Sequence, residues 1–266
     1  MKKVGFIGAG NMVKAMIKGM LKNDVMSSSI YVSGRDMEKL IELGKLLSIN
    51  VSESNIELVK NCDIVFLGVK PNIYSKVIDE IKNYTDEDKV VVSITPGYSL
   101  KELEDMFGKN VKVVRTMPNT PAMVGEGVTA YCIGENISLI EENEIKNILK
   151  CFGLVEKVEE KEMDAVVATT GSSPAYVYMF IEAMADAAVL GGISRDKAYR
   201  LAAQAVLGSA KMVLETEMHP GALKDMVCSP GGTTIEAVTT LEENGFRNAI
   251  IKAMRNCMEK SKKMNS

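Results

Sequence analysis

Val4-Gly5-Phe6-Ile7-Gly8-Ala9-Gly10-Asn11-Met12-Val13 joins a short apolar run to an amphipathic segment that continues to Lys22. The apolar run predicts a β-strand, the amphipathic spacing predicts a helix, and the two glycines predict a tight turn between them. Gly8 permits that turn, and Gly10 removes the side chain that would keep a pyrophosphate from the helix N-terminus. The stretch therefore predicts a dinucleotide site with contacts from Gly8, Ala9, Gly10, Asn11 and Met12.

The third position of this glycine pattern departs from the usual residue. Val13 stands where glycine or alanine is common, so we expect the helix to pack slightly further from the strand there. A glycine turn that binds no ligand is the alternative interpretation. The strand before the turn and the helix after it favour the dinucleotide.

Further apolar runs follow the first one, separated by a helical pattern at 37–47 and other polar segments. They lie at residues 30–33, 63–69, 89–94 and 111–115. Near-continuous apolar runs are typical of parallel strands that are covered on both faces. The alternation predicts an α/β fold, with a doubly wound, Rossmann-type dinucleotide-binding domain over residues 1–161.

The second part of the chain has a different pattern. From residue 162 to 266 it is rich in Ala, Met and Leu at helical spacing, which predicts an all-helical second domain. Its segment 175–190 carries only Glu182 and Asp186 as charges, so a helix there must be buried on most sides. We expect a second subunit to cover it, which makes this the dimerisation domain. An interior helix within one chain is the alternative.

The end of the predicted second strand bears on the choice of cofactor. NAD-binding proteins usually place Asp or Glu there for the ribose 2′-hydroxyl, whereas this strand ends in Ser33-Gly34-Arg35. A hydroxyl and a guanidinium suit a 2′-phosphate, so we expect NADPH, with NADH as a weaker alternative. Asp36 is free to cap the next helix. Arg35 as an ordinary solvated charge is the other interpretation.

Three more segments follow predicted strands and should border the same crevice, since ligands bind at the carboxyl ends of parallel strands. The first is Val69-Lys70-Pro71, and the second is the loop with Thr95 and Pro96. The third, residues 115–121, holds two prolines around Asn119 and is predicted to be a rigid loop. Each of these segments alone is equally consistent with a surface loop.

A glycine-rich segment in the helical part predicts a second site. Residues 229–232 (Ser-Pro-Gly-Gly) lead into Thr233 and Thr234, which can open a helix. Exposed backbone N–H groups together with two hydroxyls suit a carboxylate. Ordinary N-capping by threonine is the alternative.

Composition excludes several classes of partner. The chain has 266 residues and a formal net charge of -3, so we expect no nucleic-acid partner and no anionic membrane surface. No export signal and no apolar stretch long enough for a membrane span is evident. Five scattered cysteines favour a reducing, cytoplasmic location, and no ligand cluster predicts a metal. The cysteines are Cys62, Cys132, Cys151, Cys228 and Cys257.

Three segments of the chain resemble the pyrroline-5-carboxylate reductase family. They are Gly171-Ser172-Ser173-Pro174-Ala175-Tyr176, His219-Pro220-Gly221-Ala222-Leu223-Lys224-Asp225 and Ser229-Pro230-Gly231-Gly232-Thr233-Thr234. The resemblance implies reduction of 1-pyrroline-5-carboxylate to L-proline, the last step of proline biosynthesis. It also implies NADPH in the first domain and a homodimer or larger homo-oligomer built on the second.

The resemblance also implies roles for individual residues. Asn55 would lie near the adenosine ribose, and the small-molecule substrate would meet Glu217, Thr233 and Thr234, with Gly231 and Gly232 forming the turn beside it. Met226 stands where some members carry a polar residue that touches the ligand.

The residues themselves favour an imine over an alcohol as the substrate. Oxidising an alcohol requires a general base, whereas an imine nitrogen is basic enough to be protonated near neutral pH. His219 is the single histidine, and no lysine occurs between residues 171 and 193, where β-hydroxyacid dehydrogenases carry theirs. Thr234 is the predicted catalytic residue, donating to or accepting from the imine nitrogen. The alternatives are a related imine-acid or hydroxyacid oxidoreductase and a non-catalytic NADPH sensor.

Overall fold

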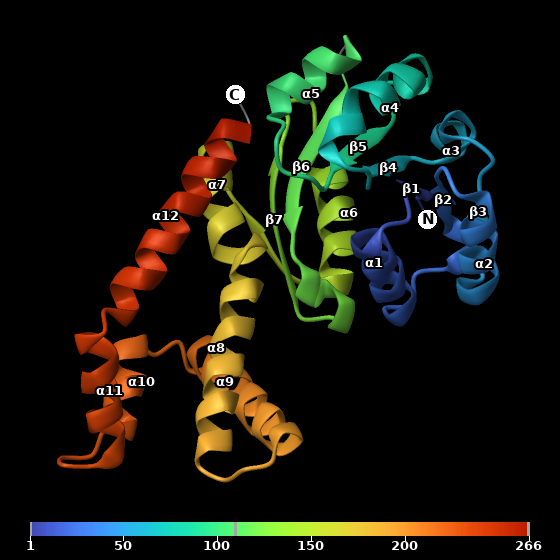
Figure 1. The fold of residues 1–266 in the computed structure, drawn as a ribbon. Helices are drawn as coiled ribbons and strands as arrows, with labels where there is room; N and C mark the ends of the chain where they lie inside the picture. Colours follow the sequence, from blue (N-terminus) through green and yellow to red (C-terminus); the bar gives the residue numbers. More distant parts are fainter. Residues whose placement is uncertain (1, 109–110, 265–266) are drawn as a thin grey trace. The chain divides into compact units, whose positions relative to one another are not determined.

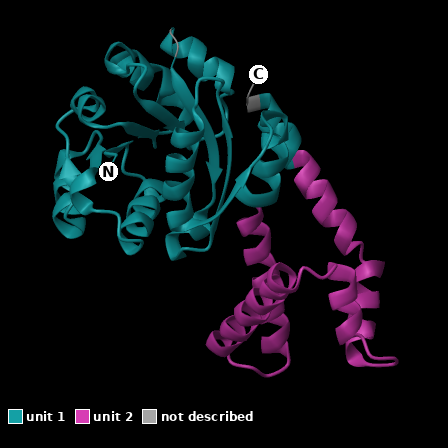
Figure 2. Cartoon of the chain, turned by 180° about the vertical axis from the view of Figure 1, so that it is seen from behind, with its two compact units in different colours: residues 1–172, 257–266 teal, residues 173–256 magenta. Residues whose placement is uncertain are grey.

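The computed structural model describes residues 2–108 and 111–264, and contacts between residues divide the chain into two units (Figure 2). The first unit extends to Ser172 and resumes at Cys257; the second is Ser173–Asn256. The boundary between the units falls at 172/173, and the boundary predicted from the sequence is 161/162. Residues 163–171 lie with the first unit because Asn119 donates a 3.0 Å hydrogen bond to the Thr170 carbonyl. Ser261 in turn donates to the Asp164 carboxylate at 2.6 Å, and Cys257 Sγ lies 3.2 Å from Ser172 Oγ.

Among the described residues, eight strands form one sheet in the order β3-β2-β1-β4-β5-β6-β7-β8. They are β1 (Val4–Ile7), β2 (Ile30–Ser33), β3 (Asn50–Val51), β4 (Ile64–Leu67), β5 (Val90–Ser93), β6 (Lys112–Pro118), β7 (Gly127–Ile133) and β8 (Gly153–Lys157). Strands β1 to β6 run parallel, which confirms the doubly wound arrangement. The strand order reverses between β1 and β4, because β2 and β3 lie on one side of β1 whereas β4, β5 and β6 lie on the other. Sheets of this type bind their ligands at the point of reversal.

The far edge of the sheet holds two further strands, β7 and β8, that the apolar runs did not predict. Strand β7 pairs antiparallel with β6, and β8 runs parallel to β7. Residues 115–118 were predicted to be a loop, but pairing with β7 carries β6 on to Pro118, opposite Thr129. Only beyond Pro118 does the chain leave the strand, entering the 3-10 helix η4 (Thr120–Val124).

Helices cover both faces of the sheet in the first unit. The helices are α1 (Asn11–Lys22), α2 (Met37–Leu47), α3 (Asn55–Asn61), α4 (Tyr74–Ile81), α5 (Leu100–Phe107), α6 (Leu139–Leu149) and α7 (Met163–Val166). In Figure 1, α3, α4 and α5 lie above the sheet, and α1 and α2 lie below it. Ile64 and Phe66 enter the core with α1 and α6, whereas Val65 and Leu67 enter the core with α4 and α5. Because neighbouring residues face opposite cores, the strands are continuously apolar.

Short helical turns connect these elements. They are η1 (Ser27–Ser29), η2 (Pro71–Ile73), η3 (Lys82–Tyr84), η5 (Lys150–Phe152), η6 (Glu160–Glu162) and the π-helical η7 (Val167–Gly171).

The second unit is helical throughout, as predicted. Its elements are α8 (Ser173–Leu190), α9 (Arg195–Thr216), α10 (Pro220–Val227), α11 (Thr233–Glu243) and the first part of α12 (Phe246–Met264). Helices α8 and α9 pack against each other, with Ala185, Ala198 and Ala202 buried. Phe180 and Phe246, with ring centroids 6.0 Å apart, join α8 to the start of α12. Over residues 2–108 and 111–264, no helix is both long and apolar enough to span a membrane.

Candidate functional site

The glycine turn after β1 has the geometry that a dinucleotide requires. Gly8 adopts φ +103°, and a Cβ there would lie 2.6 Å from the Gly68 carbonyl oxygen, so glycine is obligatory. Gly10 is different, because a Cβ there would meet no protein atom within 4 Å. Packing therefore does not explain Gly10, whereas the close approach of a ligand does.

Gly10 also leaves the N-terminus of α1 open. It is the N-cap residue, no side chain caps the helix, and no acidic residue stands in its first turn. Free backbone N–H groups at a helix start bind pyrophosphate well. Ala9 is half-buried, Asn11 is exposed on the first turn, and Met12 packs partly against the core. This end of α1 fits the phosphates of a dinucleotide.

Val13 is accommodated by a glycine on the neighbouring strand end. Its side chain is buried, and a Cβ at Gly68 would lie 2.2 Å from Val13 Cγ2. The methyl groups of Val13 thus occupy the space that Gly68 leaves. Gly68 thus accommodates the larger residue at the third position of the glycine pattern.

The end of β2 holds a chain of hydrogen bonds. Ser33 Oγ donates to Asn55 Oδ1 at 2.8 Å, and Asn55 Nδ2 donates to Glu80 Oε2 at 2.8 Å. Ser33 is fully buried, whereas Asn55 is half-buried at the start of α3. In this structure the Ser33 hydroxyl supports Asn55, and its contact with a phosphate stays a prediction.

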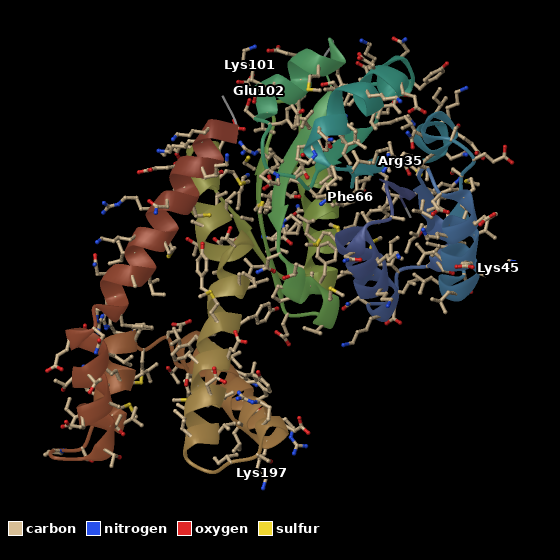
Figure 3. The ribbon with its side chains drawn as sticks, viewed as in Figure 1. Arg35, Lys45, Phe66, Lys101, Glu102 and Lys197 are labelled. Atoms are coloured by element: carbon tan, nitrogen blue, oxygen red, sulfur yellow. The ribbon has the colours of Figure 1, made fainter. Side chains whose placement is uncertain are left out.

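Arg35 lies just beyond this chain and is exposed (Figure 3). Within the part of the molecule that the structure describes, its guanidinium makes no hydrogen bond or ion pair, so it is available for an anion. Asp36 caps α2 as expected, accepting from the Lys39 backbone N–H at 3.2 Å. Its side-chain hydrogen bond with Lys39 lowers the pKa of Asp36. The Asp36 carboxylate thus forms its hydrogen bonds with the first turn of α2.

Two tyrosines hold the loops after β4 and β5 together. Tyr98 donates from its hydroxyl to the Pro71 carbonyl at 3.1 Å, and its ring stacks on Tyr74 with centroids 5.1 Å apart. The Tyr74 hydroxyl donates to the Leu67 carbonyl at 2.8 Å and lies 3.1 Å from Ser93 Oγ. Burial raises the pKa of Tyr74 far above its usual range, so it remains a protonated donor. Local sequence patterns gave no signal for either tyrosine.

These tyrosines position the residues predicted from the strand ends. Lys70 is exposed as the N-cap of η2, with Val69 and Pro71 half-buried on either side. Thr95 and Pro96 are half-buried in the loop after β5. The structure therefore brings both predicted loops to one edge of the sheet.

Asn119 has a structural role at the end of β6. It is buried, its Nδ2 donates to the Thr170 carbonyl at 3.0 Å, and its Oδ1 accepts from the Val128 N–H at 2.8 Å. The side chain thus fastens the end of β6 to η7 and β7. Its contact with the cofactor stays a prediction.

The second unit presents an open helix start at the predicted substrate segment. Helix α11 begins at Thr233, with Gly232 as an N-cap that supplies no side-chain bond. Gly231 adopts φ +66°, which favours glycine, and a Cβ on Gly232 would lie 2.3 Å from Ser229 Oγ and 3.1 Å from the Ser229 carbonyl oxygen. Thr233 and Thr234 are exposed in the first turn rather than at the cap. The alternative of threonine capping is not realised here.

The neighbouring residues of this unit have structural features of their own. Glu217 ends α9 in the left-handed region with φ +54° and is exposed. His219 caps α10, its Nδ1 accepting from the Gly221 N–H at 3.0 Å. Pro220 and Gly221 therefore form the first turn of this helix. Met226 is 69% exposed. In the part of the chain that is described, no hydrogen bond links Glu217 to Thr233 or Thr234.

Two family models match the chain. Residues 160–264 match the model described as pyrroline-5-carboxylate reductase dimerisation. Residues 3–97 match the model described as NADP oxidoreductase coenzyme F420-dependent. The open glycine turn and strands β1 to β5 of the sheet lie within the second match.

Together these features define the class of the protein as an NADP-dependent oxidoreductase with a helical C-terminal part. A pyrroline-5-carboxylate reductase of Escherichia coli (strain K12) is 52% identical over 264 residues, 99% of this chain and 98% of that relative. One of Methanosarcina acetivorans is 42% identical with the same coverage. The chain belongs to the pyrroline-5-carboxylate reductase family.

Solved structures agree with this assignment. Pyrroline carboxylate reductase of Plasmodium falciparum, with NADP bound, has a TM-score of 0.90 at 36% identity and covers 100% of this chain and 98% of its own. The pyrroline-5-carboxylate reductase of Coxiella burnetii reaches 0.94 at 33% identity, covering 100% and 99%.

Proposed function

We propose that this enzyme reduces 1-pyrroline-5-carboxylate to L-proline with NADPH, completing proline biosynthesis. The observation that carries the proposal is the 52% identity to a reductase of that name over 99% of the chain. The first unit binds the cofactor and the second binds the substrate. Hydride adds to the imine carbon, and the imine nitrogen takes up a proton to give the secondary amine.

The first unit has the groups that NADPH needs. NADPH supplies the hydride when it is bound. The open N-terminus of α1 holds the pyrophosphate, and the exposed Arg35 pairs with the 2′-phosphate. Asn55 faces the adenosine ribose, and the tyrosine-fixed loops at Lys70 and Thr95 border the remainder.

In the second unit, the start of α11 holds the substrate. Its free N–H groups donate hydrogen bonds to the carboxylate, and the Thr234 hydroxyl contacts the imine nitrogen. Glu217 and Thr233 complete the predicted contacts. The task of these residues is mainly to orient a protonated imine, which needs no strong general base.

The second unit also supports a homo-oligomer. Helices α10 and α11 are described in full and have no buried residue, while Tyr178, Met179 and Leu214 are more than half exposed. So much exposed apolar surface marks an interface. We propose that a second copy of the chain covers it, with a dimer as the minimal assembly and no nucleic-acid partner. The five free thiols fit a cytoplasmic location.

The test follows NADPH oxidation with 1-pyrroline-5-carboxylate and identifies the product by chromatography. We expect proline in a one-to-one ratio with NADPH consumed. A six-membered cyclic imine acid tests the related imine-acid activity, and a 2-hydroxy acid with NADP⁺ tests the hydroxyacid alternative. Cofactor binding without formation of proline would overturn the proposal and favour a sensor.

A further inference from the structure

A carboxylate on α4 reaches the cofactor end of β2 through an amide. Glu80, exposed on the last turn of α4, accepts from Asn55 Nδ2 at 2.8 Å, and Asn55 Oδ1 accepts from Ser33 Oγ at 2.8 Å. Ser33 is the last residue of β2, and the second strand of such a sheet ends at the ribose 2′ position. Residues 33, 55 and 80 therefore form a relay at the group that distinguishes NADPH from NADH.

The direction of every hydrogen bond in this relay is fixed by Glu80. An ionised carboxylate only accepts, so the Asn55 amide must turn its NH₂ group towards Glu80. The Asn55 carbonyl then faces Ser33, whose hydroxyl must donate. Ser33 is buried and is the last residue of β2, so the Asn55 carbonyl oxygen, and not its NH₂ group, points towards the end of β2.

This orientation affects the two cofactors differently. A carbonyl oxygen accepts a hydrogen bond from a ribose 2′-hydroxyl, but it offers no donor to a 2′-phosphate. We propose that Glu80 is a positioning residue that sets cofactor selectivity through Asn55, supporting NADH and restraining the preference for NADPH. The inference rests on the cofactor placement of the proposed function. Arg35 and Glu80 thus act in opposite directions on the same ribose.

The experiment measures dissociation constants for NADPH and NADH by cofactor fluorescence, without substrate. Glu80→Ala releases the amide of Asn55, which then turns its NH₂ group towards the phosphate. We expect the ratio of NADH to NADPH dissociation constants to rise about 5- to 30-fold, as one hydrogen bond to a charged group is gained and one to the hydroxyl is lost. Glu80→Gln, whose amide permits either orientation, should shift the ratio in the same direction.

The matched control is Asp79→Ala. Asp79 carries the same charge one residue earlier on α4, but it pairs with Lys82 at 2.7 Å and is 65% exposed. Because solvent and salt screen exposed charges, we expect the ratio to change less than about twofold. An equal change in Asp79→Ala would attribute the effect to general charge and overturn the proposal.

A double variant tests whether Glu80 acts through Asn55. In an Asn55→Ala background the relay is absent, so adding Glu80→Ala should leave the ratio within about twofold. A full shift in that background would overturn the proposal, as would equal changes for both cofactors in Glu80→Ala alone. Because these are binding measurements, they remain informative if the enzyme fails to form proline.

Discussion

Arg35 is an exposed cation with no partner among the described residues, at the point where a 2′-phosphate would lie. A charge-assisted contact contributes about 1.5–3 kcal/mol, so Arg35→Ala should weaken NADPH binding about 10- to 100-fold. NADH lacks the phosphate and should bind within about twofold of its original affinity. Fluorescence titration measures both, and Lys45→Ala, an exposed cation on α2, is the control. Equal losses with both cofactors would contradict this placement of the phosphate.

Thr234 is the proposed catalytic residue. If its hydrogen bond to the imine nitrogen tightens as hydride arrives, it stabilises the transition state more than the ground state. Thr234→Ala should then lower kcat by about 10²- to 10³-fold while NADPH binding is unchanged, and Thr234→Ser should retain most activity. Steady-state kinetics distinguish this from simple binding, in which kcat stays normal and only KM rises.

For single residues, the sequence predicted those roles that depend only on neighbours in the chain. Gly8 and the cap at Asp36 follow from turn and helix chemistry within a few residues. The burial of Ser33 and Asn119 could not be predicted, because it depends on partners distant in the chain. Asn119 is fastened to Thr170, 51 residues away, and no local pattern contains that contact.

Among the elements, the N-terminus of α6 carries a carboxyl group, Glu141, that should make the stability of the fold depend on acid pH. Burial by itself raises the pKa of Glu141, but hydrogen bonds from Lys112 and Ser138 outweigh it and lower the pKa to about 2. A lowered pKa stabilises the fold above the pKa of the unfolded chain, near 4.3, and this stability is lost as the pH falls towards 2.

We therefore expect the free energy of unfolding to fall by about 2 kcal/mol more in the wild type than in Glu141→Gln between pH 5 and pH 2. Urea unfolding at each pH measures the difference. Glu144→Gln, on the same helix, should keep the dependence of the wild type. Parallel curves for the wild type and Glu141→Gln would show that the ion pair contributes nothing.

Strand prediction succeeded where burial alone determines the pattern. The strands β1, β2, β4 and β5 are apolar at every position or nearly so because each lies between two helical layers. β3 has two residues, too few for a periodic signal, and β8 is mostly exposed. The direction of β7 and the extension of β6 to Pro118 result from their mutual pairing, which is not a local property.

For the whole molecule, the exposed apolar surface of the second unit predicts that assembly and folding are linked. Met179 on α8 is 69% exposed and belongs to the proposed interface. Met179→Lys would place a charge there without a partner and should disperse or unfold the oligomer. Light scattering with analytical ultracentrifugation measures the mass. Leu46→Lys, a comparable change at a 75% exposed leucine of the first unit, should leave it intact. An active wild-type monomer would refute the assembly.

The return of α12 to the first unit has a consequence for synthesis on the ribosome. Residues from Cys257 onward complete that unit through Ser172 and Asp164, although nearly the whole helical unit is translated between them. A nascent chain can form the sheet early, but η7 and α7 lack their partner helix until residues 257–261 have been synthesised. Contacts that close so large a loop form slowly. Synthesis of this helix, rather than emergence of the sheet, therefore sets the earliest moment at which this unit becomes complete.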